Sequence, residues 1–85
     1  MTGSDFSISE HLRAVFHCDD SLVSFYFVYD DTMIGQTITL SRDGATALGD
    51  RIAKTGEWDA LPVSMATSDL KAFGARLRDY GVNGC

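Results

Sequence analysis

Two pairs of adjacent aspartates, Asp19-Asp20 and Asp30-Asp31, are the first feature of this sequence that could do chemistry. Carboxylate oxygens are the ligands that calcium and magnesium prefer, so paired acids can form a metal site. Residues 22–29 lie between the pairs and, as a strand, span about 26 Å at ~3.3 Å per residue. The two pairs therefore lie at opposite ends of a strand and cannot share an ion. Neither pair sits in an EF-hand loop, and we expect no metal site.

Two other interpretations of these acids remain open. Aspartate favours turns, and charges that flank an aromatic strand discourage its aggregation. Alternatively, the acids form a rim that binds a basic surface of another protein. Pairing of the neighbouring strands brings Glu10 towards the second aspartate pair, which strengthens the second interpretation. The charged candidates for partner binding are Glu10, Asp19, Asp20, Asp30 and Asp31.

The nucleophiles and bases of the chain form no catalytic pattern. His17 and Cys18 are adjacent, but neighbours on a strand point to opposite faces and cannot work as base and nucleophile. The serines lack the G-x-S-x-G context of a hydrolase nucleophile. The sequence also contains no phosphate-binding glycine loop. We therefore expect no enzyme activity, no catalytic residue and no cofactor.

The chain has two cysteines, Cys18 and Cys85. Two thiols are too few for a disulfide framework, and their spacing matches no zinc pattern. Cys18 lies in an apolar stretch, so we expect a small buried hydrophobic residue there. Cys85 is the last residue, and we expect an exposed, mobile thiol.

The net charge of −5 is confined to one half of the chain. Residues 1–41 carry six acids and one base, whereas residues 42–85 carry six of each. Binding to DNA or RNA needs a basic face, so this distribution disfavours it. No apolar stretch approaches the roughly 18 residues of a membrane span, and the first residues do not resemble a signal peptide. The expected location is the cytoplasm.

The first half of the chain reads as strands. Apolar residues alternate over residues 11–18 and 34–40, and residues 22–29 are aromatic and β-branched, as expected for an antiparallel sheet with one buried face. A four-residue loop over residues 30–33 would pair Tyr29 with Ile34 and Phe25 with Ile38, so that the apolar faces coincide. We expect a three-stranded meander.

The second half reads as two helices. Ser41 is a cap for a first helix that carries Ala45, Leu48 and Ile52 and stops at Gly56. Its internal glycines could permit close packing on the sheet. A second helix begins at Thr67 or Ser68 and ends at Gly81, with an apolar stripe made of Leu70, Phe73, Leu77 and Tyr80.

These elements predict a single α+β domain over residues 1–85 with the order β-β-β-α-(β)-α and both helices on one sheet face. Residues 57–66 alternate in a way that suggests a short fourth strand, with Pro62 at an edge. In the same segment, Trp58 is expected to form a lid on the core. Residues 1–9 and 82–85 are expected to be flexible ends.

The sheet face away from the helices is also partly apolar. It carries Tyr26, Val28 and Val15, and such a surface suggests a partner-binding or homodimer contact. Together with the acids, these features predict a small acidic binding protein. The expected activity is inhibition of a larger protein by covering a basic, nucleic-acid-binding type of surface, as phage anti-defence (anti-CRISPR) or toxin-immunity proteins do. The alternative is a homodimeric structural or small-ligand-binding module that uses the outer sheet face.

Overall fold

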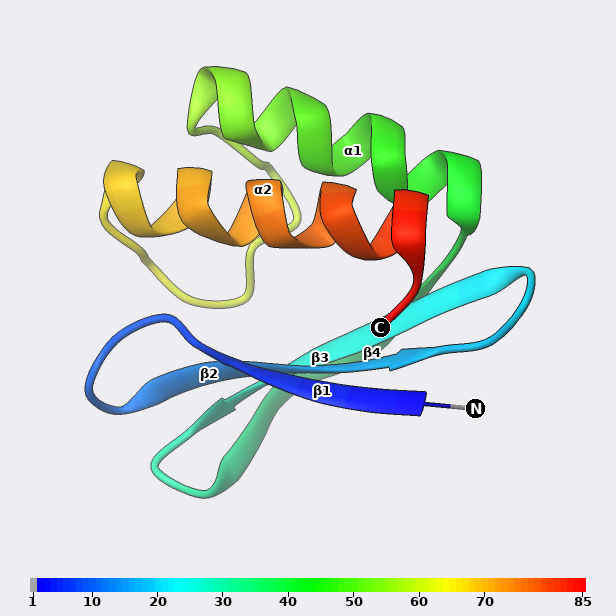
Figure 1. Cartoon of the computed structure of the whole chain (residues 1–85). Coiled ribbons are helices and arrows are strands. Elements are labelled where there is room, and N and C mark those ends of the chain that lie inside the picture. Colours follow the sequence, from blue (N-terminus) through cyan, green and yellow to red (C-terminus); the bar gives the residue numbers. More distant parts are fainter. Residues whose placement is uncertain (1) are drawn as a thin grey trace.

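Four antiparallel strands carry two helices on one face in the computed structural model, which describes residues 2–85 (Figure 1). The strands lie side by side in chain order. This confirms the α+β meander with both helices on the same face. The elements are β1 (Thr2–Ser7), β2 (Leu12–Cys18), β3 (Leu22–Tyr29), β4 (Thr32–Ser41), α1 (Arg42–Thr55) and α2 (Thr67–Asn83).

The fourth strand lies at the start of the chain, where flexible residues were expected. β1 pairs with β2 so that Ser4 faces Phe16 and Phe6 faces Ala14. Phe6 and Ile8 pack against the core, and the Ser4 hydroxyl lies 2.7 Å from the Tyr80 hydroxyl of α2. These contacts order the segment, because each of the three residues has a partner on the buried side of the sheet. Met1 lies outside the described residues.

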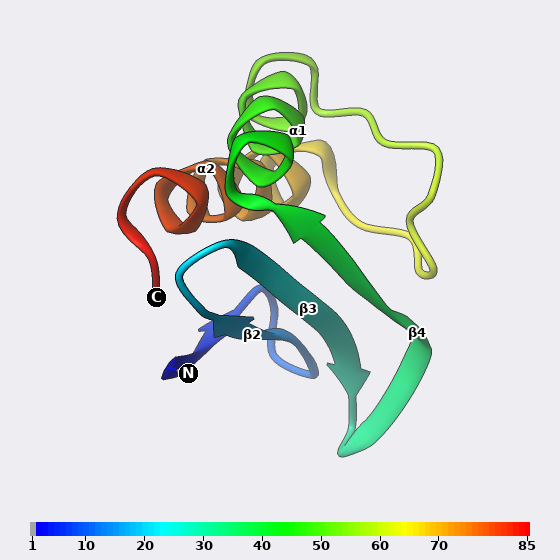
Figure 2. The same cartoon turned by 90° about the vertical axis from the view of Figure 1, so that its right-hand side faces the viewer.

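The predicted strand within residues 57–66 is absent from the described structure, and the segment instead forms a lid. Figure 2 shows this loop passing beside β4 on the way from α1 to α2. Its alternating apolar residues point inward because they fill the wedge between the helices and the sheet. The indole of Trp58 is nearly parallel to the Phe73 ring, with the ring centres 6.0 Å apart, as expected for a lid. The half-buried residues of the lid are Trp58, Leu61, Val63 and Met65.

The β3–β4 connection is shorter than the sequence indicated. Tyr29 pairs with Thr32 rather than Ile34, so only Asp30 and Asp31 form the turn. The expected pairing of Phe25 with Ile38 is nevertheless present. Between these two points β4 contains an irregularity opposite Tyr26, where a bulge absorbs the extra residues of β4.

Four phenylalanine rings lie fully buried in the core. Phe16, Phe25 and Phe27 from the sheet meet Phe73 from α2, with ring centres 5.2–5.9 Å apart. All four side chains are at most 1% exposed. Tilted and edge-to-face arrangements of this kind add to the stability gained from burial alone. The apolar sheet face predicted from alternation is therefore the face that the helices cover.

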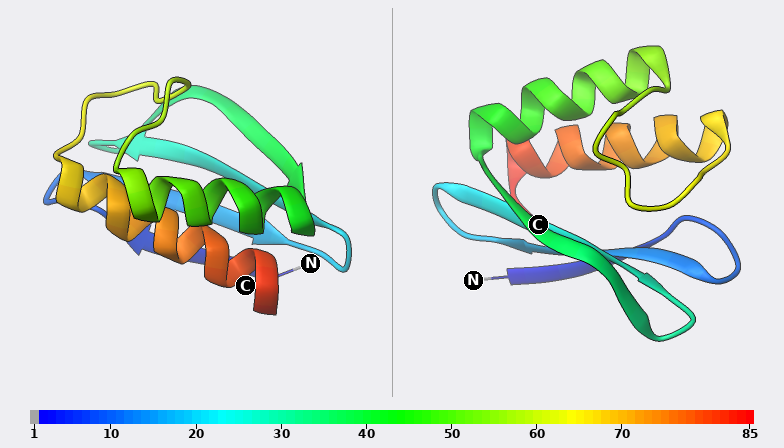
Figure 3. Two further views of the ribbon diagram at one scale, coloured as in Figure 1. Left: turned by 90° about the horizontal axis from the view of Figure 1, so that it is seen from above. Right: turned by 180° about the vertical axis from the view of Figure 1, so that it is seen from behind.

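The two helices approach each other so closely that only glycine fits at the contact. A Cβ atom at Gly49 would lie 2.6 Å from the Gly74 carbonyl oxygen, and one at Gly81 would lie 2.6 Å from the Thr46 nitrogen. Gly49 therefore packs on α2 and not on the sheet. Gly81 continues α2 instead of ending it, since the helix runs to Asn83. Figure 3 shows the helices side by side above the sheet.

The helix ends follow the sequence in one helix and not in the other. The Ser41 hydroxyl accepts a hydrogen bond from the Gly44 amide at the start of α1, and Gly56 ends that helix in the left-handed conformation. Both features confirm the prediction. α2 begins after Ala66, which offers no capping side chain, so neither Thr67 nor Ser68 is its cap.

The two cysteines form a disulfide, which the sequence did not lead us to expect. Cys18 at the end of β2 is joined to Cys85, with their Cα atoms 5.5 Å apart. Gly84 follows α2 with a φ of 83°, which turns the last residue back towards the sheet. The chain terminus is thus fixed to the core and is not a mobile thiol.

Candidate functional site

Three acids of the first half lie together at one end of the sheet. We call Glu10, Asp30 and Asp31 the acidic tip. The β2–β3 pairing places Leu12 beside Tyr29, and the Asp30 amide donates a hydrogen bond to the His11 carbonyl at 3.0 Å. The β1–β2 loop and the β3–β4 turn therefore meet, and all three acids line one shallow depression there. Pairing brings them together as the sequence predicted.

His11 is the only basic side chain that contacts the acidic tip in residues 2–85. Its Nδ1 atom lies 2.7 Å from an Asp30 carboxylate oxygen and its Nε2 atom lies 3.8 Å from Glu10. Arg13 also lines the depression but is paired with Asp5 at 2.9 Å. Within residues 2–85, no cationic side chain forms an ion pair with Asp31. The tip therefore keeps an excess of negative charge.

Two large exposed side chains lie at the strand ends next to the acidic tip, on opposite faces of the sheet: Tyr29 is on the face of Phe27, whereas Met33 pairs with Val28 on the other face. Tyr29 ends β3 with 44% of its surface exposed, and Met33 near the start of β4 is 47% exposed. Tyrosine and methionine are enriched in protein interfaces. The sequence reasoning missed both residues as functional candidates, because a four-residue loop left Met33 in the turn and assigned Tyr29 to the buried face. The Asp-Asp pair itself could have indicated the two-residue turn, since aspartate is tolerated at positive φ.

The two residues of the β3–β4 turn both have a left-handed backbone conformation. Asp30 and Asp31 have φ angles of 48° and 66°, and they are the only non-glycine residues with positive φ within residues 2–85. Glycine or asparagine satisfies such a turn better. Left-handed backbone at non-glycine residues often marks a functional position. The sequence thus places two charges where the backbone alone would favour a neutral residue.

The other aspartate pair lies at the opposite end of the sheet, as predicted. One Asp19 carboxylate oxygen accepts hydrogen bonds from the Ser21 and Leu22 amides at 2.8 and 2.7 Å. These bonds lower the pKa of Asp19 below its usual 3.8. Asp19 is therefore explained by the turn that it stabilises, whereas the Asp20 side chain accepts no such hydrogen bond from residues 2–85. The structure brings neither residue near the acidic tip.

The outer sheet face offers less apolar surface than the sequence suggested. Val15 and Val28 point away from the helices but are only 9% and 6% exposed, because side chains of the neighbouring strands cover them. Tyr26 is half-buried and its ring stacks on His17 with a centre distance of 6.2 Å. Of the three residues, only Tyr26 presents appreciable surface to a partner.

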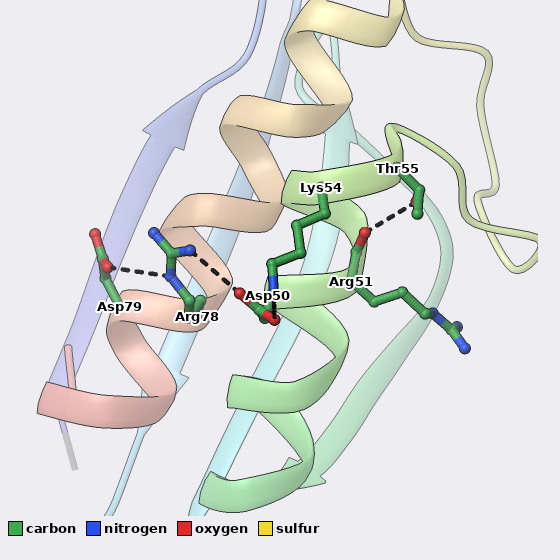
Figure 4. A network of polar contacts seen from close by, with 6 residues as sticks. All are labelled: Asp50, Arg51, Lys54, Thr55, Arg78 and Asp79. Atoms are coloured by element: carbon green, nitrogen blue, oxygen red, sulfur yellow. Dashed lines mark hydrogen bonds and ion pairs between the residues drawn. The ribbon is translucent and has the colours of Figure 1, made fainter.

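The helix layer balances its own charges, unlike the sheet. Figure 4 shows Asp50 of α1 between Lys54, at 2.9 Å, and Arg78 of α2, at 3.4 Å. The hydrogen bond from Lys54 is the main cause of a lowered pKa at Asp50. Arg78 also approaches Asp79 at 4.0 Å. The uncompensated charge of the molecule consequently lies on the sheet and its loops.

The described residues hold no group of three or more histidine, cysteine, aspartate or glutamate side chains placed to bind a metal. Neither helix within residues 2–85 is long and apolar enough to cross a membrane. Comparisons with protein-family models, with curated proteins and with solved structures found no match to this chain. The functional argument therefore depends on the geometry of the acidic tip.

Proposed function

We propose that this protein is a non-enzymatic inhibitor that covers a basic surface of a larger protein with its acidic tip. A basic surface of this kind is one that binds nucleic acid or another polyanion. The partner would present arginine or lysine side chains to Glu10, Asp30 and Asp31. Opposite potentials speed the encounter of two proteins and favour the correct partner over others.

The observation that carries the proposal is the excess of acid at the tip, where His11 is the only basic side chain within residues 2–85 that contacts the three acids, with exposed Tyr29 and Met33 at the adjoining strand ends. An exposed tyrosine can become a buried anchor in a protein interface, and a few such anchors supply most of the binding energy. The positive φ angles of Asp30 and Asp31 are those that a two-residue hairpin turn requires, and glycine or asparagine would meet this requirement without adding charge. Asp19, in contrast, is better explained by its own turn than by binding.

The disulfide bears on which kind of inhibitor this is. Disulfides persist in oxidising compartments and are rare in the cytosol. The Cys18–Cys85 bond therefore favours the toxin-immunity type, acting outside the reducing cytoplasm, over the anti-CRISPR type and over the cytoplasmic location expected from the sequence. Alkylation of free thiols in the native host, followed by mass spectrometry, measures whether Cys18 and Cys85 are joined there. Two alkylated cysteines would favour the cytoplasmic alternative.

A pull-down with three matched baits tests the proposal. The first is the wild type, and the second carries Glu10→Gln, Asp30→Asn and Asp31→Asn. The third removes the same charges from exposed, unpaired acids elsewhere, through Glu57→Gln, Asp43→Asn and Asp59→Asn. We expect a basic host protein to bind the wild type and the third bait, and to be lost with the second bait and at high salt. Equal capture by all three baits would refute the proposed role of the tip.

A homodimeric module built on the outer sheet face remains the second candidate. The burial of Val15 and Val28 does not favour it, since a face-to-face contact needs exposed apolar area. Light scattering of the wild type and of Tyr26→Ser distinguishes the homodimeric module from the inhibitor. If the outer sheet faces form a dimer, Tyr26→Ser should dissociate it.

A further inference from the structure

One histidine bridges the two segments that form the acidic tip. His11 lies in the loop between β1 and β2, and Asp30 lies in the turn between β3 and β4. The His11 Nδ1 atom is 2.7 Å from an Asp30 carboxylate oxygen, and its Nε2 atom is 3.8 Å from a Glu10 carboxylate oxygen. Both ring nitrogens of the histidine therefore face an acid of the tip.

The backbone keeps the imidazole beside these acids. The Asp30 amide donates a hydrogen bond to the His11 carbonyl oxygen, and Leu12 pairs with Tyr29 in the sheet. The His11 and Tyr29 rings lie 6.0 Å apart, centre to centre. The position of the imidazole thus follows from the pairing of β2 with β3.

The imidazole can exchange a proton with solvent, because the His11 side chain is 52% exposed. Histidine is the side chain that ordinarily gains a proton between about pH 8 and pH 5, whereas carboxyl groups ordinarily stay ionised over this range. The acidic tip carries three carboxylates, and protonation of His11 offsets one of their charges. The charge of the tip therefore depends on the state of one residue.

The other groups around the ring have a fixed charge in this pH range. Arginine and ionised carboxylates keep their charge, and tyrosine stays neutral. Arg13 lines the same depression, but its guanidinium is already paired with Asp5. The charged or titratable groups that contact His11 or line the depression with it are Glu10, Asp30 and Asp31 from the loops, Arg13 from β2 and Tyr29 from β3.

We propose that His11 makes the binding of a basic partner depend on pH, so that the partner is released as histidine becomes protonated. This inference rests on the proposed function of the acidic tip. When His11 is neutral, the three carboxylates are available to cationic side chains of the partner. When it is protonated, His11 forms an ion pair with Asp30 and repels those cations, which lowers the complementarity of the two surfaces.

The affinity of an oligo-arginine peptide with blocked ends, at about pH 7.5 and about pH 5.5, tests the proposal. The peptide represents the basic surface, and its own charge does not change between these two values. The proteins are the wild type, His11→Gln and the matched control His17→Gln. His17 is the second of the two histidines and stacks on Tyr26 towards the other end of β2.

We expect the wild type to bind the peptide about fivefold more weakly at the lower pH, the usual effect of one exposed charge pair. His11→Gln should bind equally well at both values, and His17→Gln should behave as the wild type does. A wild type that responds to pH no more than His11→Gln does would overturn the proposal.

The acidic-tip variant, with Glu10→Gln, Asp30→Asn and Asp31→Asn, separates this failure from a failure of the proposed function. If the peptide binds the wild type more tightly than this variant but without a pH response, only the role of His11 is refuted. If it binds both proteins equally tightly, or neither, the proposed function fails and the pH dependence fails with it.

Proton release gives a second readout that needs no variant. Because the proton and the partner oppose one another, binding of the peptide near pH 6.5 should displace protons from the protein. Isothermal titration calorimetry in two buffers of different ionisation enthalpy measures this release. A binding enthalpy that is the same in both buffers would contradict the proposal.

Discussion

Asp19 and Asp31 have similar sequence contexts but different contacts in the structure. Asp19 binds two backbone amides of its own turn. Asp31 accepts no hydrogen bond within the described structure, sits at a φ of 66° and faces solvent. Sequence reasoning separated the two pairs only by the expected position of Glu10, because adjacent acids beside a strand give no indication of which carboxylate will meet a free amide. The difference shows that Asp19 stabilises its own turn, whereas no hydrogen bond within residues 2–85 gives Asp31 the same role.

The backbone of Asp31 can be tested by Asp31→Gly. Glycine adopts positive φ without strain, so we expect the free energy of unfolding to rise by about 0.5–1 kcal/mol. Urea denaturation measures the change. Asp20→Gly removes one acid at a position without positive φ and should lower stability instead, by up to about 1 kcal/mol. A loss of stability in Asp31→Gly as large as that in Asp20→Gly would show that the turn is not strained.

The lowered pKa of Asp19 predicts how stability depends on pH. A carboxyl group with a lower pKa in the folded than in the unfolded state stabilises the fold above its unfolded pKa, near 3.9. That contribution is lost as the pH falls through the folded pKa. We expect the unfolding free energy of the wild type to fall below about pH 4 more steeply than that of Asp19→Asn. Identical pH profiles for the two proteins, measured by urea denaturation, would mean that the amide hydrogen bonds do not stabilise the carboxylate.

Strands and helices could be predicted where the spacing of apolar residues follows their burial. They could not be predicted where contacts with another element determine the structure. Alternation located β2, β3 and the second half of β4, and Ser41 and Gly56 marked the ends of α1. β1 was not predicted because the residues around Phe6 are mostly polar. It forms a strand because it pairs with β2. The lid over residues 57–66 imitates a strand because every second side chain points inward to the core.

The close contact between the two helices was not predicted either, because glycine in a helix is expected only to lower helix stability. Helix propensity alone says that Gly49→Ala should stabilise α1 by up to about 1 kcal/mol. In the structure a Cβ atom there would meet the Arg78 backbone and the Gly74 carbonyl oxygen at 2.8 Å or less. We expect a loss of about 1–3 kcal/mol, as for other overpacked sites. Thermal unfolding decides between the two signs, and a stabilised variant would mean that the helices are farther apart.

At the scale of the whole molecule, one covalent bond links the last residue to the sheet. The two joined cysteines are 67 residues apart in sequence, so the bond restricts most of the unfolded chain. The chain-entropy relation gives a stabilisation of about 4 kcal/mol for a loop of this length. We expect reduction of the wild type to lower its unfolding free energy by about that amount. Cys85→Ser should resemble the reduced protein and be insensitive to reductant. An equally stable reduced protein would show that packing alone holds the terminus.

The charge separation is also a property of the whole molecule. Residues 42–85 pair many of their charges within the helix layer, whereas the sheet gathers acids at its two ends. The sequence predicted this imbalance from composition and predicted the meeting of Glu10 with Asp30 and Asp31 from strand pairing. It could not show that Tyr29 and Met33 are exposed at the strand ends next to these acids, because that depends on the length of one turn.

The central claim is that the acidic tip binds a basic protein surface, and salt-dependent affinity tests it most directly. The measurement is the dissociation constant between the captured partner and three proteins, at low and high ionic strength. The proteins are the wild type, the acidic-tip variant (Glu10→Gln, Asp30→Asn, Asp31→Asn) and the matched variant (Glu57→Gln, Asp43→Asn, Asp59→Asn).

We expect the acidic-tip variant to bind about tenfold or more weakly than the wild type at low salt and to lose most of the salt dependence. The matched variant should retain both the affinity and the salt dependence of the wild type. An acidic-tip variant that binds as tightly as the wild type, with the same response to salt, would contradict the account.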